Sequence, residues 1–216
     1  MPEYKTEPIV VPVNSGILPE GERNRRVALT SFAGLQPPPQ VPRHTVVCYE
    51  CGQLTEVPAA ALSAKCSACN AHLKMTDVTL KPGAQRLTVR TLGDVTVQSG
   101  AVLSQVTVVC RHCYVNGRAS GSYQCSGNME VSCSNRMEGP VQADKLVVDR
   151  AVNLILTQGA TVGVLEVCGR VTGRIVARES VILRRGAELI GTCYSPSLKR
   201  EPGAVHRGEW HNEVPS

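Results

Sequence analysis

The cysteines between residues 48 and 69 are the residues whose type and spacing most directly indicate chemistry. They form two C-x2-C pairs separated by fourteen residues: Cys48 with Cys51, and Cys66 with Cys69. Each pair can present two sulfurs from one tight turn, and two such turns close a tetrahedral four-sulfur site of the kind that holds structural zinc. The alternative is four unrelated buried thiols, which would not require this spacing. The sequence therefore predicts one structural Zn²⁺ in a zinc-ribbon-like module over residues 44–77.

Four further cysteines follow at a less regular spacing. They are Cys110, Cys113, Cys125 and Cys133, in the pattern C-x2-C-x11-C-x7-C. A second metal site formed by these four residues is one interpretation. The other is that cysteines act as small apolar side chains that fill a core, and the repeat described below supports this for Cys113 and Cys125.

Common catalytic patterns are not found in the sequence. It contains neither a Gly-x-x-x-x-Gly-Lys-[Ser/Thr] loop for nucleotide phosphates nor a Gly-x-Ser-x-Gly elbow for a nucleophile. The five histidines have no nucleophile at a suggestive spacing. Asp144 and Asp149 are better explained as solvated strand and corner residues than as paired carboxylates. We therefore expect a protein that is not an enzyme and has no small-molecule substrate.

Residues 1–43 have the composition of a disordered tail. Eight of the fourteen prolines fall in this segment, and neither a helical nor an alternating pattern persists in it. Three arginines before Val27 offer a weak contact to a membrane or a protein, and a solvated tail is the alternative. No apolar run approaches 18 residues and no signal peptide is recognisable. We therefore expect a cytoplasmic protein, peripheral at the inner membrane if the tail makes that contact, with thiols rather than disulfides.

An internal repeat dominates residues 78–209. Residues 115–123 align without gaps on residues 167–175, an offset of 52, and a Gly-Ala pair recurs with a spacing of 17. Within this repeat, apolar or small residues recur at every sixth position, in two interleaved series. One series is Leu165, Val171, Ala177, Leu183 and Leu189, and the other is Ile175, Val181, Ala187 and Cys193.

Three six-residue sides in each turn of 17–18 residues describe a coil of triangular cross-section. Each side is a short strand that pairs with the same side of the next turn, whereas a helix would need a period of 3.6 and a hairpin sheet a period of two. Only seven of the 216 residues are aromatic, as expected for a core too narrow for large rings. We therefore predict an all-β fold, a single-stranded β-helix (β-solenoid) of about seven turns over 78–209, followed by a short tail at 210–216.

Residues 167–191, VCGRVTGRIVARESVILRRGAELIG, resemble the signature of the bactofilin family. That signature is a G-x-v-x-G-x-I segment, an apolar stretch and a closing g-A-x-v-x-G. Bactofilins are bacterial cytoskeletal proteins involved in cell shape, built on a right-handed β-helix flanked by disordered tails, and they polymerise without nucleotide. The resemblance covers residues 80–209 and is best over 162–208. A zinc ribbon before the β-helix departs from the usual family layout.

The resemblance implies a right-handed coil and a homopolymer. His206 stands where the closing pattern of the family usually has an aromatic residue, and Trp210, the only tryptophan, lies close behind it. We therefore predict His206 and Trp210 as contacts at the end of the polymer.

Three functions are compatible with these features. The first, which we favour, is a structural protein that self-assembles end to end into nucleotide-independent filaments, with the ribbon used for folding or docking. The second is a zinc-ribbon adaptor for nucleic acid or protein on a β-helix scaffold. A net charge of −1 over residues 44–80 argues against nucleic acid. The third is a hexapeptide-type acyltransferase, which is least favoured because the ladder lacks the aliphatic–glycine repeat of those enzymes.

Overall fold

The computed structural model describes residues 42–84 and 88–215, and these contain only strands, turns and bends. The sequence predicts a disordered tail with a membrane or partner contact over residues 1–43. Residues 1–41 of this segment lie outside the described residues. None of the described segments forms a helix long and apolar enough to cross a membrane. The all-β class predicted from the sequence is confirmed.

The first part of the described chain is made of two small antiparallel hairpins. One pairs β1 with β2 and the other pairs β3 with β4. Val57 in β2 and Leu73 in β4 are fully buried, while most of their strand neighbours are exposed. The four strands are β1 (Arg43–Val47), β2 (Leu54–Pro58), β3 (Ser63–Lys65) and β4 (His72–Lys74). The predicted zinc-ligand pairs lie in the loops of these hairpins.

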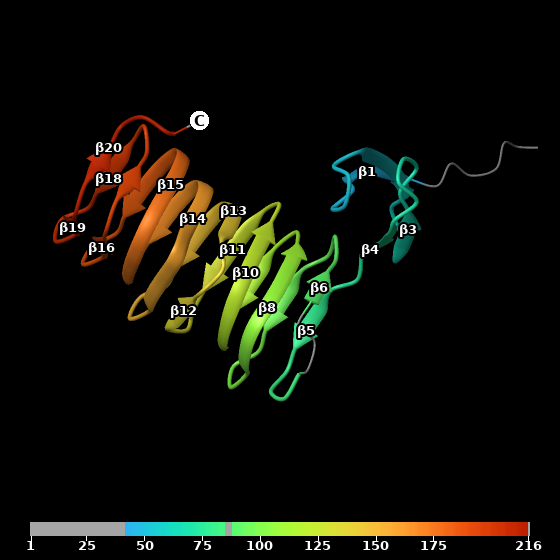
Figure 1. The fold of residues 1–216 in the computed structure, drawn as a ribbon, viewed down its shortest axis with the longest axis horizontal. Coiled ribbons are helices and arrows are strands. Elements are labelled where there is room, and N and C mark those ends of the chain that lie inside the picture. The colour runs from blue at the N-terminus through green and yellow to red at the C-terminus, as the bar shows by residue number, and fades with distance from the viewer. Residues whose placement is uncertain (1–41, 85–87, 216) are drawn as a thin grey trace, which may run out of the picture. The chain divides into compact units, whose positions relative to one another are not determined.

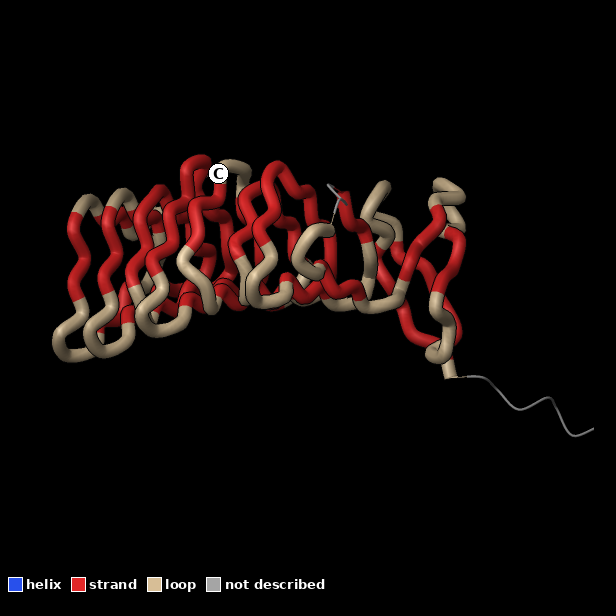
Figure 2. The backbone as a smooth tube through the Cα atoms, turned by 90° about the horizontal axis from the view of Figure 1, so that it is seen from below, coloured by secondary structure: helices blue, strands red, loops and turns tan. Residues whose placement is uncertain are grey.

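The remaining sixteen strands form one parallel sheet that coils on itself. Figure 1 shows its strands stacked side by side from β5 to β19, and Figure 2 shows the successive coils of the backbone. The strands are β5 (Val78–Leu80), β6 (Thr88–Arg90), β7 (Val95–Val97), β8 (Val102–Cys110), β9 (Cys113–Val115), β10 (Arg118–Cys125), β11 (Asn128–Val131), β12 (Asn135–Met137), β13 (Val141–Val148), β14 (Asn153–Val167), β15 (Arg170–Leu183), β16 (Glu188–Ile190), β17 (Cys193–Tyr194), β18 (Leu198–Arg200), β19 (Val205–Arg207) and β20 (Trp210–His211).

Strand register divides this β-solenoid into about eight turns, one more than the sequence predicts. One inward-facing column runs through all of them by successive pairing of equivalent residues. Its members are Val78, Val95, Cys113, Met129, Leu146, Leu165, Val181 and Leu198. The last turn includes β20, which pairs with β17, so the parallel ladder continues past residue 209.

The repeats found in the sequence correspond directly to these turns. All nine residues of the two six-residue series are 0–1 % exposed. The offset of 52 residues is three turns, since Val115, Val131, Val148 and Val167 pair in succession. Single turns vary in length around the predicted 17–18 residues, because the pairing contains bulges such as the one between Val162 and Val164.

The core accommodates one aromatic ring, contrary to the expectation that the coil is too narrow. Tyr123 is 1 % exposed, and its hydroxyl donates a hydrogen bond of 3.0 Å to the carbonyl of Ala119. Its partner on the next turn is the smaller Val141, followed by Ala160. Small residues around one position therefore create the space that the ring fills.

Charged side chains on the outside of the solenoid join successive turns. Glu166 accepts from Lys145 at 2.8 Å and from Arg184 at 2.7 Å, and Arg184 also contacts Glu201 at 2.7 Å. The Lys145 ammonium and, to a smaller extent, the Arg184 guanidinium lower the pKa of Glu166 below its ordinary value, although desolvation of the carboxylate acts in the opposite direction. This chain of ion pairs connects four consecutive turns.

Candidate metal centre

The two C-x2-C pairs form turns with the same backbone hydrogen bonds. In the first, the Cys48 N–H donates to the Gln53 carbonyl at 2.9 Å, and the Gly52 N–H donates back to the Cys48 carbonyl at 2.9 Å. In the second, the Cys66 N–H donates to the carbonyl of residue 71 at 2.9 Å, and the Asn70 N–H donates to the Cys66 carbonyl at 3.0 Å.

Both turns need a residue with positive φ after the second cysteine. Gly52 has a φ of 74° and Asn70 a φ of 58°, and these are the residue types that adopt this conformation most readily. The equal hydrogen bonding explains how two short, separate segments present their sulfurs in equivalent ways.

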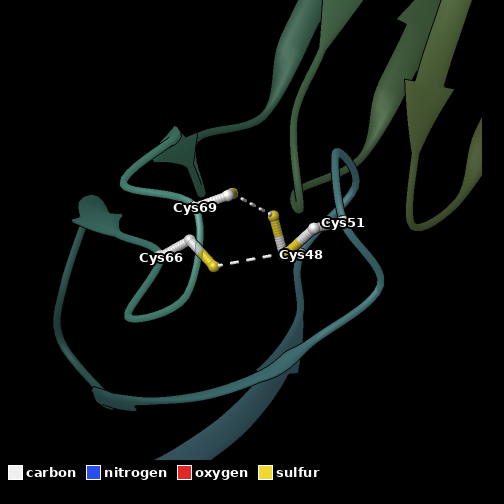
Figure 3. A group of neighbouring side chains, drawn as sticks. All are labelled: Cys48, Cys51, Cys66 and Cys69. Carbon is white, nitrogen blue, oxygen red and sulfur yellow. Dashed lines mark hydrogen bonds between the residues drawn. The ribbon is translucent and has the colours of Figure 1, made fainter.

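The four sulfurs of these turns point toward one another, as Figure 3 shows. The Sγ atoms of Cys48 and Cys69 are 3.7 Å apart, as are those of Cys51 and Cys66, and all four lie within 4.8 Å of one another. Tetrahedral zinc with Zn–S bonds of about 2.3 Å requires sulfurs about 3.8 Å apart. The group therefore fits one tetrahedral metal ion.

Hydrogen bonds from the backbone adjust the acidity of these thiols. The Cys69 and Ala68 N–H groups lower the pKa of Cys66 to about 6, and the Thr55 hydroxyl, 3.7 Å from the Cys66 sulfur, acts in the same direction. The Ala71 N–H lowers the pKa of Cys69, but desolvation and the neighbouring thiols outweigh it and raise that pKa to about 12. A bound cation would stabilise all four groups as thiolates.

The surroundings of the group show contacts that the sequence did not indicate. The Tyr49 hydroxyl donates to the carbonyl of His72 at 2.6 Å and so joins the two hairpins. Leu92 of the solenoid packs against the cluster of buried side chains around Cys48 and Leu73, and its N–H donates to the Lys74 carbonyl at 2.7 Å. No spacing or motif in the sequence indicates these contacts.

The structure brings together three of the four cysteines in the second group. The ligand atoms of Cys110, Cys113 and Cys125 lie within 4.8 Å of one another in the interior of the solenoid. Cys133 lies apart from them, and its sulfur is 3.7 Å from the carbonyl oxygen of Ser134. The thiols of Cys113 and Cys125 lower the pKa of Cys110 to about 5 by hydrogen bonding to its sulfur.

The predicted polymer contacts lie on the last turn of the solenoid. His206 continues an inward column after Leu189, and its Nε2 is 3.3 Å from the Gly191 carbonyl oxygen. Trp210 continues another column after Cys193, and its Nε1–H donates to the Ser195 carbonyl at 3.0 Å. Both residues therefore lie at the last described position of an inward column.

Comparison of the chain with protein-family models, with curated proteins and with solved structures found no match.

Proposed function

We propose that the protein is a structural subunit that assembles end to end with copies of itself into filaments, without a nucleotide. In this proposal the ribbon binds one structural Zn²⁺ and serves to fold or dock the subunit. The resemblance to bactofilins agrees with this function. The partner is a second copy of the chain, and a cytoplasmic location, with a membrane or protein contact through the tail, belongs to the same proposal.

The observation that supports the proposal best is the open strand edge of the last turn. The Val205 N–H donates to Ala187 and the Arg207 carbonyl accepts from Gly191, both at 2.9 Å. Successive residues of a parallel strand direct their backbone groups to opposite neighbours, so the N–H and C=O of His206 point away from the preceding turn. Among the described residues no strand pairs with this outer edge of β19.

The same arrangement is found in β20. The carbonyls of Glu209 and His211 accept from Cys193 at 2.9 Å and from Ser195 at 2.8 Å, which leaves the backbone groups of Trp210 facing outward. The apolar side chains of Trp210 and Val205 are 46 % and 42 % exposed. An unpaired edge beside apolar side chains is a template for the strand of another molecule.

Repeated end-to-end pairing gives an open filament. Each added subunit would continue the parallel ladder across the junction, so assembly needs no energy source beyond strand pairing and burial of the end of the core. Neither step uses a catalytic group or a bound small molecule.

Electron microscopy of the purified full chain without nucleotide tests this function. We expect filaments whose length increases with protein concentration. His206→Pro removes the outward N–H and should abolish them, whereas His206→Ala keeps that N–H and should preserve them. Circular dichroism establishes that both variants are folded. Monodisperse particles of the natural chain over a range of salt and concentration would refute the proposal, as would equal assembly of the two variants.

A protein-docking adaptor is the second candidate, and exposed apolar residues on the ribbon favour it. Val47 and Leu54 face each other across β1 and β2 and are 53 % and 61 % exposed, and Leu62 is 72 % exposed. Apolar surface of this kind suits a protein partner better than nucleic acid. A DNA-binding assay at two salt concentrations separates the partners, because binding that weakens steeply with salt would indicate nucleic acid.

A further inference from the structure

Three cysteine side chains converge inside the solenoid, at a place that the proposed filament does not use. Cys110 ends β8, Cys113 begins β9, and Cys125 ends β10 on the following turn. Their exposed fractions are 4 %, 0 % and 5 %. The sulfurs of Cys110 and Cys125, which are direct partners in the parallel ladder, are 3.6 Å apart, and all three lie within 4.8 Å of one another.

Packing alone does not require sulfur at these positions. Cys113 has Val95 and Met129 as its partners on the two adjoining turns. In the column that contains Cys110 and Cys125, the equivalent residue of the next turn is Ala143, since Gln124 pairs with Gln142. Alanine and valine therefore fill the same columns elsewhere, yet here three thiols meet at one point.

We propose that Cys110, Cys113 and Cys125 form a second metal site, which binds one thiophilic divalent cation of the zinc class through three thiolates. The separation of 3.6 Å is close to the value of about 3.8 Å that zinc–sulfur bonds impose. Binding releases the three thiol protons, and no electron is transferred. Among the described residues no other histidine, cysteine or carboxylate belongs to this group.

The fourth coordination position is open to a ligand from solvent. Cys110 and Cys125 border a surface cavity, which Ser126 and Asp144 also line. An ion can reach the sulfurs from this cavity, and a water molecule can complete the coordination shell. Zinc sites with three protein ligands keep a fourth position for water or another small ligand, whereas structural sites with four protein ligands are closed.

Charge favours a divalent over a monovalent cation. Three thiolates with Zn²⁺ leave one negative charge, whereas three thiolates with Cu⁺ leave two. An uncompensated charge in an apolar core is unfavourable.

The test is the zinc content of the full chain, loaded with Zn²⁺ under a reductant and separated from free metal. We expect two zinc ions per chain. Cys110→Ala with Cys113→Val and Cys125→Ala should reduce the content to one, and these replacements match residues that fill the same columns. The ribbon variant Cys48→Ser with Cys66→Ser should also hold one.

Matched controls and a second metal make the result decisive. Cys133→Ser removes a thiol outside both groups and should leave two zinc ions bound. One zinc per natural chain that the triple variant retains, or two in the triple variant with its solenoid strands still folded by circular dichroism, would overturn the proposal. A single equivalent of Cu⁺ bound in place of the second Zn²⁺, and lost in the triple variant, would overturn the divalent assignment.

Discussion

Removal of the metal is expected to unfold the ribbon while the solenoid stays folded. Among the described ribbon residues, Val57 and Leu73 are the only aliphatic side chains that are fully buried. Burial of one such side chain contributes about 1.5–3 kcal/mol, so the two contribute no more than about 6 kcal/mol. A structural zinc ion contributes about 10–16 kcal/mol. A zinc ion bound at the four cysteines would therefore be the larger stabilising contribution to this module.

Hydrogen exchange with and without a strong chelator measures this directly. The amides of Cys48 and Cys66, which donate hydrogen bonds inside the two turns, should lose their protection when the metal is removed. The amide of Val181 should keep its protection, because the core of the solenoid is a separate cluster of buried residues. Cys48→Ser with Cys66→Ser should reproduce the loss without chelator, and Cys168→Ser should not. Ribbon amides that remain protected in metal-free protein would refute this reasoning.

Three further predictions concern the solenoid. Leu165→Ala should lower the free energy of unfolding by about 3 kcal/mol in chemical denaturation, and Leu198→Ala, in the half-buried end of the same column, by about 1 kcal/mol. Gly121→Ala should prevent folding or lower the free energy of unfolding by more than about 3 kcal/mol, because the added Cβ would lie 1.9 Å from a backbone oxygen. The matched change Gly186→Ala should lower it by about 1–2 kcal/mol, because its Cβ would have no neighbour within 4 Å and only the φ of 76° is unfavourable. Glu166→Gln should lower the melting temperature at pH 7. Since the folded-state pKa of Glu166 is lowered, this difference is fully present above the ordinary carboxyl pKa and is lost progressively as the pH falls from there through the lowered folded-state pKa.

The sequence was sufficient to predict the inward columns because a solenoid repeats one local environment. A residue at a given place in one turn meets its equivalents above and below, so the chain needs an apolar or small residue there every turn. The column containing Leu165 follows this rule in every described turn. The column containing Val171 follows it over Leu154, Val171 and Leu189, and has the polar residues Asn135 before and His206 after them. The grouping of Cys48, Cys51, Cys66 and Cys69 was predictable for a different reason, since the turns that present these cysteines are local.

The position of Cys110 could not be predicted from the six-residue period. The register of β14 against β15 shifts by one residue between Val162 and Val164, and Val162 is buried although it belongs to neither series. The repeat of 52 residues does carry the signal, because it places Cys110 on the buried Val162 and Cys133 on the exposed Arg185. The offset of 52 residues spans three whole turns with their bulges, so it relates equivalent positions. The six-residue period takes no account of the bulges and loses this equivalence.

In the proposed filament, the last turn of the solenoid supplies the physical reason for association. Every interior turn has a neighbouring turn on both sides. These neighbours supply its backbone hydrogen-bond partners and pack against its inward-facing side chains. The turn that contains Leu198, His206 and Trp210 has such a neighbour on one side only. A second copy placed on this end would supply the missing backbone partners and cover the same columns. The free energy gained at the junction should therefore resemble that of one interior pair of turns, less the entropy lost on association.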